Sequence, residues 1–72
     1  MVYREDNPQY HLVKVRGMLN AVIRHCREDT EKVAEPNAQA LFRMTVELLE
    51  GLMTAYTRCE QELEDKTRGM AA

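Results

Sequence analysis

The sequence contains no tryptophan and no serine, and only two cysteines and two prolines among its 72 residues. Without serine, and with no cysteine and histidine spaced to suggest a triad, nucleophilic catalysis has no visible basis. No stretch approaches the roughly 20 apolar residues that a membrane-spanning helix requires, and the N-terminus is charged rather than apolar. We therefore expect a soluble, cytoplasmic protein that is not an enzyme, has no cofactor and does not contact membranes.

The two cysteines, Cys26 and Cys59, are too few for the disulfide framework of a secreted domain. Both lie at apolar positions of the helical pattern, which predicts small buried hydrophobes. No metal site is predicted, because neither these cysteines nor His25 stand at a known metal-binding spacing. If two chains pair with their turns at opposite ends, the three residues share a layer across chains. A thiol or metal sensor with an intersubunit cysteine layer is therefore one alternative function.

Charge and size bound the class of protein further. There are 10 lysines and arginines against 12 acidic residues, and the formal net charge of -2 argues against a general nucleic-acid binder. A hydrophobic content of 44% with 31% charged residues is typical of a helical bundle. A chain of 72 residues is near the size at which a single core is marginal, so a partner chain is expected.

Proline marks the boundaries of two predicted helices in a single domain. Asn7 can cap a helix, and Pro8 is suited to its first position, where a backbone N–H has no partner to lose. Pro36 disfavours helical geometry at Glu35, and Asn37 is a candidate cap for the second helix. The predicted antiparallel hairpin comprises a helix over about 8–33, a turn over about 34–37, a helix over about 38–67 and a frayed tail over 68–72.

Apolar residues gather on one side of each predicted helix. At about 100° per residue they occupy an arc of roughly 140° on the first helix and roughly 160° on the second, which is wider than one neighbouring helix covers. Because an exposed apolar stripe normally marks an interface, we predict an all-α homodimer in which two hairpins form a four-helix bundle. The predicted interface residues are Leu12, Val15, Leu19, Val22, Leu41, Leu48, Leu49, Leu52, Met53 and Tyr56.

Self-association leads to a first hypothesis for function, a small non-catalytic interaction or regulatory module that acts as a homodimer. Its rival is a hairpin that docks the second helix on a different, unknown protein partner. In either case function depends on exposed faces rather than on a pocket.

A polar stripe of Arg16, Asn20, Arg24 and Arg27 runs beside the apolar arc of the first helix. A two-fold dimer would duplicate it. In architecture such a dimer resembles the small four-helix bundles of the plasmid-copy-control Rop type, which grip structured RNA across a face of their first helices. The likeness is one of architecture, and no Rop motif is matched residue by residue. It implies RNA binding as an alternative function, against the simpler expectation that the stripe is solvated or paired with the acidic end of the second helix, which an antiparallel turn brings beside the start of the first.

Overall fold

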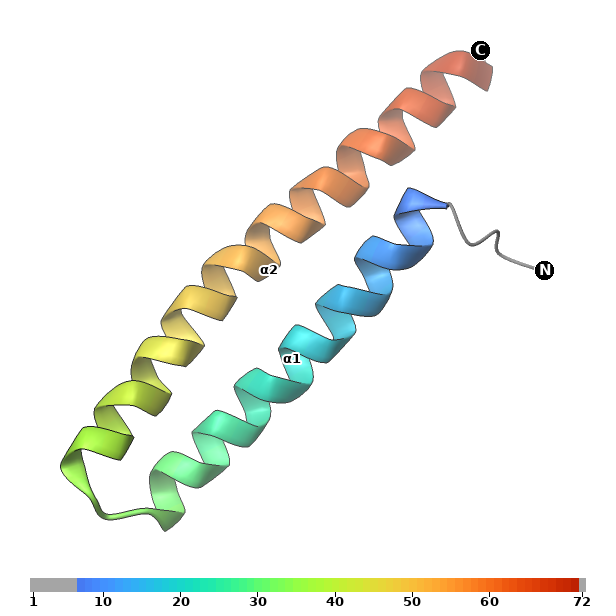
Figure 1. The fold of residues 1–72 in the computed structure, drawn as a ribbon. Helices are drawn as coiled ribbons and strands as arrows, with labels where there is room; N and C mark the ends of the chain where they lie inside the picture. Colours follow the sequence, from blue (N-terminus) through green and yellow to red (C-terminus); the bar gives the residue numbers. More distant parts are fainter. Residues whose placement is uncertain (1–6, 72) are drawn as a thin grey trace.

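The chain folds into two antiparallel helices joined by a short loop, as shown in Figure 1. A computed structural model describes the backbone of residues 7–71 and the side chains of residues 7–66. Helix α1 spans Pro8–Lys32 with 25 residues, and helix α2 spans Pro36–Ala71 with 36 residues. The molecule measures 55 × 22 × 15 Å, so it is a single layer of two helices lying side by side. The predicted all-α hairpin is confirmed.

The start of α1 follows the predicted signal. The Asn7 side chain accepts a hydrogen bond of 3.2 Å from the backbone N–H of Tyr10, and Pro8 occupies the first turn. At the other end the backbone N–H of Val33 donates to the carbonyl of Asp29 at 2.9 Å, which closes the last turn. Lys32 lies in that turn, where a cation is favoured by the helix dipole.

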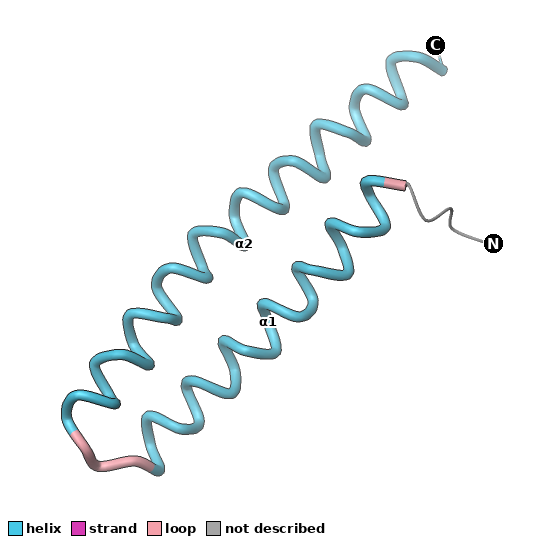
Figure 2. Tube along the Cα trace, in the orientation of Figure 1, coloured by secondary structure: helices cyan, strands magenta, loops and turns pink. Residues whose placement is uncertain are grey.

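The loop between the helices is shorter than predicted, as the pink segment of Figure 2 shows. Pro36 is the first residue of α2 rather than part of the turn, and Asn37 is already helical. The expected cap at Asn37 is therefore wrong. Glu35 takes that place: its carboxylate accepts a 2.6 Å hydrogen bond from the N–H of Ala38, and its carbonyl accepts one of 3.0 Å from Gln39.

Helix α2 also continues further than predicted. Its backbone is helical through Ala71, so the expected end near residue 67 is too early. The expected frayed tail over 68–72 stays a prediction, and Ala72 lies outside the described residues. Gly69, which suggested a stop, lies within the helix. A glycine in a helix interior costs only about 1 kcal/mol relative to alanine, and that cost does not end a helix whose other residues favour it.

The contact between the helices buries very little. Among the described side chains only Ile23, at 3% exposure, and Cys26, at 9%, are buried, and both lie on α1. The remaining apolar residues along the seam between the helices are half-buried. They are Leu12, Val15 and Leu19 on α1, Val33 just after its end, and Phe42, Val46, Leu49, Met53, Tyr56 and Leu63 on α2. One hairpin therefore has a seam but no closed core.

Candidate interaction surfaces

Large apolar side chains remain in water along one side of the hairpin. On α2 these are Leu41 at 59% exposure, Met44 at 55%, Leu48 at 65% and Leu52 at 47%, and on α1 they are Met18 at 54% and Val22 at 45%. Their spacings of three or four residues keep them on one side of each helix. We call these six residues the apolar face. Val13 is also 48% exposed but lies on a different side of α1.

Ion pairs fix which side of the hairpin this face occupies. Arg27 Nη2 lies 3.0 Å from Glu50 Oε2, so these two residues mark a common face that bridges the helices. At about 100° per residue, Leu48 and Leu52 lie roughly 160° around α2 from Glu50, and Val22 lies roughly 140° around α1 from Arg27. The apolar residues of both helices therefore share the opposite face of the hairpin.

The predicted interface residues separate into two groups. Val22, Leu41, Leu48 and Leu52 are exposed on the apolar face, whereas the other six, Leu12, Val15, Leu19, Leu49, Met53 and Tyr56, are half-buried. Leu49, Met53 and Tyr56 are half-buried because α1 covers them in part, so only a fraction of each side chain is available to a second copy.

Met44 was missed by the sequence reasoning. It is 55% exposed and belongs to the apolar face. Its position three residues after Leu41 and four before Leu48 is the helical spacing that could have identified it.

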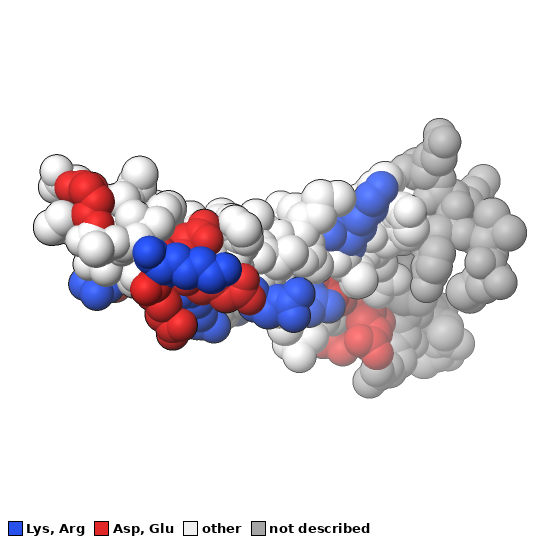
Figure 3. Space-filling view, turned by 90° about the horizontal axis from the view of Figure 1, so that it is seen from below, with Lys and Arg blue, Asp and Glu red and all other residues white. Residues whose placement is uncertain are grey.

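The opposite face carries the candidate nucleic-acid stripe, and two of its cations are already paired. Arg16 Nε donates to Glu60 Oε2 at 2.6 Å and Arg16 Nη2 to Glu60 Oε1 at 3.3 Å, a two-pronged contact in which Glu60 is only 18% exposed. With the Arg27–Glu50 pair, this gives a charged face in which basic and acidic side chains lie against one another (Figure 3). The simpler expectation, pairing with the acidic end of the second helix, is confirmed for Arg16, whereas Arg27 pairs with Glu50 in the middle of that helix.

The other two members of the stripe, Asn20 and Arg24, are exposed. Within residues 7–66, Arg24 has no ion pair. The stripe therefore presents one cation that is not already held by a carboxylate, which is a weaker attraction for a polyanion than the sequence pattern suggests.

The candidate thiol and metal residues do not meet within one chain. Cys26 is buried in the seam, Cys59 is exposed on α2, and both thiols are free. The prediction that Cys59 is buried is therefore wrong for the hairpin, because it lies beside the seam rather than in it. His25 Nε2 contacts Asp29 Oδ2 at 3.1 Å, one turn along α1. Among the described residues no group of three potential ligands is arranged to hold a metal.

The two thiols are also too far apart to bond. The Arg27–Glu50 pair places Cys26 level with Gly51, just after Glu50, so Cys59 lies about eight residues further along α2. At 1.5 Å per residue this is roughly 12 Å, well beyond disulfide reach.

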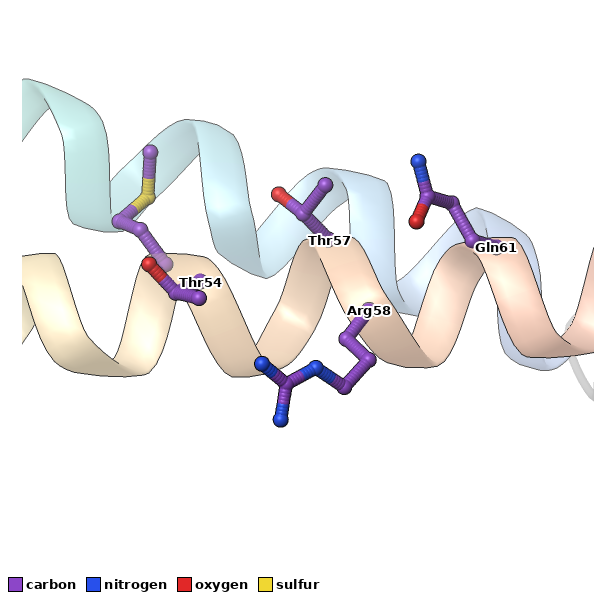
Figure 4. A pocket seen from close by; sticks show the side chains of 5 residues that line it. Thr54, Thr57, Arg58 and Gln61 are labelled. Carbon is purple, nitrogen blue, oxygen red and sulfur yellow. The ribbon is translucent and has the colours of Figure 1, made fainter.

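A shallow depression of about 370 Å³ on α2 is lined by Met53, Thr54, Thr57, Arg58 and Gln61. Figure 4 shows that the side chains of Thr57 and Gln61 project to one side of the helix and that of Arg58 to the other, so these groups do not converge on a common point.

Comparisons with protein-family models, curated proteins and solved structures find no match to this chain. Over the described residues, neither helix combines the length and the apolar character needed to cross a membrane.

Proposed function

We propose that the protein is a small, non-catalytic interaction module that acts as a homodimer, in which two hairpins form a four-helix bundle through their apolar faces. The observation that carries the proposal is the contrast between two buried side chains and the row of exposed leucines, methionines and valine on one face. Burial of apolar area is the main favourable contribution to the free energy of folding. A hairpin that buries so little apolar area by itself needs a partner to bury the rest.

The size of the apolar face is sufficient for a dimer. By the register of the Arg16–Glu60 pair, Met18 lies level with residue 58, so from Leu41 to Met18 the face extends about 26 Å along α2 at 1.5 Å per residue. The hairpin is 22 Å wide. The product is about 600 Å² per copy, or about 1,200 Å² in total, at the lower bound of stable protein interfaces. Because the closed two-fold dimer is the commonest oligomer, a second copy is the simplest occupant for this face.

Dimerisation leaves the charged face for a biological partner. Once the apolar faces are covered, the surface that remains on each copy is the side bearing the Arg27–Glu50 and Arg16–Glu60 pairs. A partner protein with interleaved charges of its own is the class that such a surface would select, since electrostatic complementarity contributes mainly to specificity and rate of association. We place this module in the cytoplasm, where two free thiols are normal.

Solution mass tests the proposal directly. Light scattering under reducing conditions should give a mass near twice the 8.4 kDa of one chain, falling towards 8.4 kDa only on strong dilution. Because each hairpin lacks a closed core, dissociation should also lower the helical circular dichroism signal at the same concentrations. A well-folded monomer at all concentrations would contradict the homodimer and would make the apolar face the docking site for a different protein.

A further inference from the structure

We infer that the two copies pair with their α2 helices antiparallel to each other, that the two-fold axis passes near Glu50 and Gly51, and that the two loops lie at opposite ends of the bundle. This inference rests on the proposed homodimer and goes beyond it, because a four-helix bundle of hairpins can also place both loops at the same end. The two arrangements differ in what faces α2: the α2 helix of the partner, or its α1 helix.

The three exposed leucines of α2 and Cys59 are spaced symmetrically about residue 50, whereas the counterpart of Met44 is the half-buried Tyr56. In an antiparallel pair centred there, Leu48 faces Leu52 of the partner subunit, and Leu41 faces Cys59 of the partner subunit. All three leucines are exposed in the hairpin, at 65%, 47% and 59% for Leu48, Leu52 and Leu41. Each would therefore be covered by an apolar or thiol side chain.

The end of the apolar positions on this side of α2 also fits the inferred arrangement. Beyond Cys59, the next positions on the same side of α2 are Glu62 and Lys66, and both are exposed. With the axis near residue 50, Glu62 lies level with the first turn of the partner's α2 and Lys66 lies level with the partner's loop. Their charged groups stay in water, so the polar end of α2 carries no desolvation cost.

The alternative arrangement sets polar groups of α1 against leucines of α2. On the side of α1 that bears Met18 and Val22, the next positions along the chain are His25 and Asp29. The register of the Arg27–Glu50 pair puts these two residues level with the part of α2 around Leu48. With both loops at the same end, the Asp29 carboxylate would therefore face the Leu48 region of the partner subunit, and covering a charge with apolar groups is costly.

Loops at opposite ends avoid that cost. The α1 helices then face each other, and the residues near the two-fold axis are those level with residue 50, including His25. The His25–Asp29 pair, with its 3.1 Å contact, meets the same pair of the partner subunit, so polar groups face polar groups at the axis. By the same register Val22 lies level with residue 31 of the partner subunit and Met18 with its loop. Cys59 then lies beside Leu41 of the partner subunit and not beside the partner's Cys26, so the native thiols do not form a shared layer.

The native Cys59 provides the test. In the inferred arrangement Leu41→Cys places a thiol opposite Cys59 of the partner subunit, whereas with both loops at the same end Cys59 faces the partner's α1 near Val15 and Met18. The variants Leu41→Cys, Val15→Cys and Met18→Cys are each oxidised mildly, and covalent dimer is measured on a non-reducing gel with the linked peptides identified by mass spectrometry. The unmodified chain and Leu41→Cys combined with Cys59→Ala are the controls.

The expected result is a disulfide-linked dimer for Leu41→Cys alone, lost when Cys59 is replaced. Linkage through Val15→Cys or Met18→Cys, or between Cys26 and Cys59 in the unmodified chain, overturns the inferred pairing. Absence of any linkage in protein whose unoxidised mass is dimeric also overturns it, while leaving the homodimer intact. A monomeric mass for the unoxidised protein instead refutes the homodimer itself. Leu41 and Met18 are more than half exposed and Val15 is half-buried, so circular dichroism is used to confirm that each variant folds.

Discussion

Replacing Leu52 by aspartate should separate the two copies. Leu52 is 47% exposed in the hairpin, so dimerisation covers roughly half of the side chain. Burying half of a leucine is worth about 1 kcal/mol, and burying a carboxylate in its place costs about 1–3 kcal/mol more. Because the substitution occurs once in each copy, the dimer should lose at least about 4 kcal/mol. That corresponds to a dissociation constant raised by about a thousandfold.

The matched control is Thr54→Asp, on the same helix. Thr54 is exposed on the charged side of α2 and donates its hydroxyl to the Glu50 carbonyl at 3.2 Å. The two variants have the same change of charge and nearly the same position along α2, so they differ mainly in the face that they alter. Sedimentation equilibrium over a range of concentrations measures both dissociation constants. If Leu52→Asp dimerises as tightly as Thr54→Asp, the apolar face is not the contact between copies.

Three further predictions concern other parts of the structure. Gly17→Ala should raise the free energy of unfolding by about 1 kcal/mol, because an added Cβ meets nothing within 4 Å and alanine favours the helix. Thermal denaturation measures this change. A loss of stability would mean that this site is covered in the dimer. Glu60→Gln should lower stability by about 1 kcal/mol by removing the half-buried pair with Arg16, while Glu62→Gln, at an exposed site, should change little. For the Rop-like alternative, Arg24→Gln should weaken binding to a labelled RNA hairpin more than Arg16→Gln does, since Arg16 is already held by Glu60; equal effects, measured by fluorescence anisotropy at two salt concentrations, would contradict this ranking.

The fold was predictable because both of its determinants are local. Helical periodicity over long segments indicates two helices, and the sequence Asn7-Pro8 places the start of the first one within a residue. The loop was placed incorrectly because proline has two roles: it excludes helix at the residue before it, and it is favoured in the first turn of a helix. Pro36 takes the second role, with Glu35 as a cap that preference rules do not favour.

The apolar face was predictable in extent but not in composition. A helical wheel gives the width of an apolar arc, and an arc of roughly 160° exceeds what one neighbour covers. It does not give the direction of that neighbour, so Leu49 and Leu52 cannot be assigned to the seam or to the outer face from spacing alone. In the structure Leu49 is half-buried and Leu52 is exposed, and the direction that separates them is fixed by long-range contacts such as the Arg16–Glu60 pair.

The ion pairs also explain why the two faces of a thin hairpin do not compete for the same partner. If the Arg16 and Arg27 side of the molecule were apolar, a second copy could pack on either face and further copies could add without limit. Charged side chains that satisfy one another across the seam keep that face hydrated, and burying them would cost more than the contact returns. In the proposed dimer, assembly through the apolar face would therefore end at two copies, and the same charged surface would lie on both outer sides.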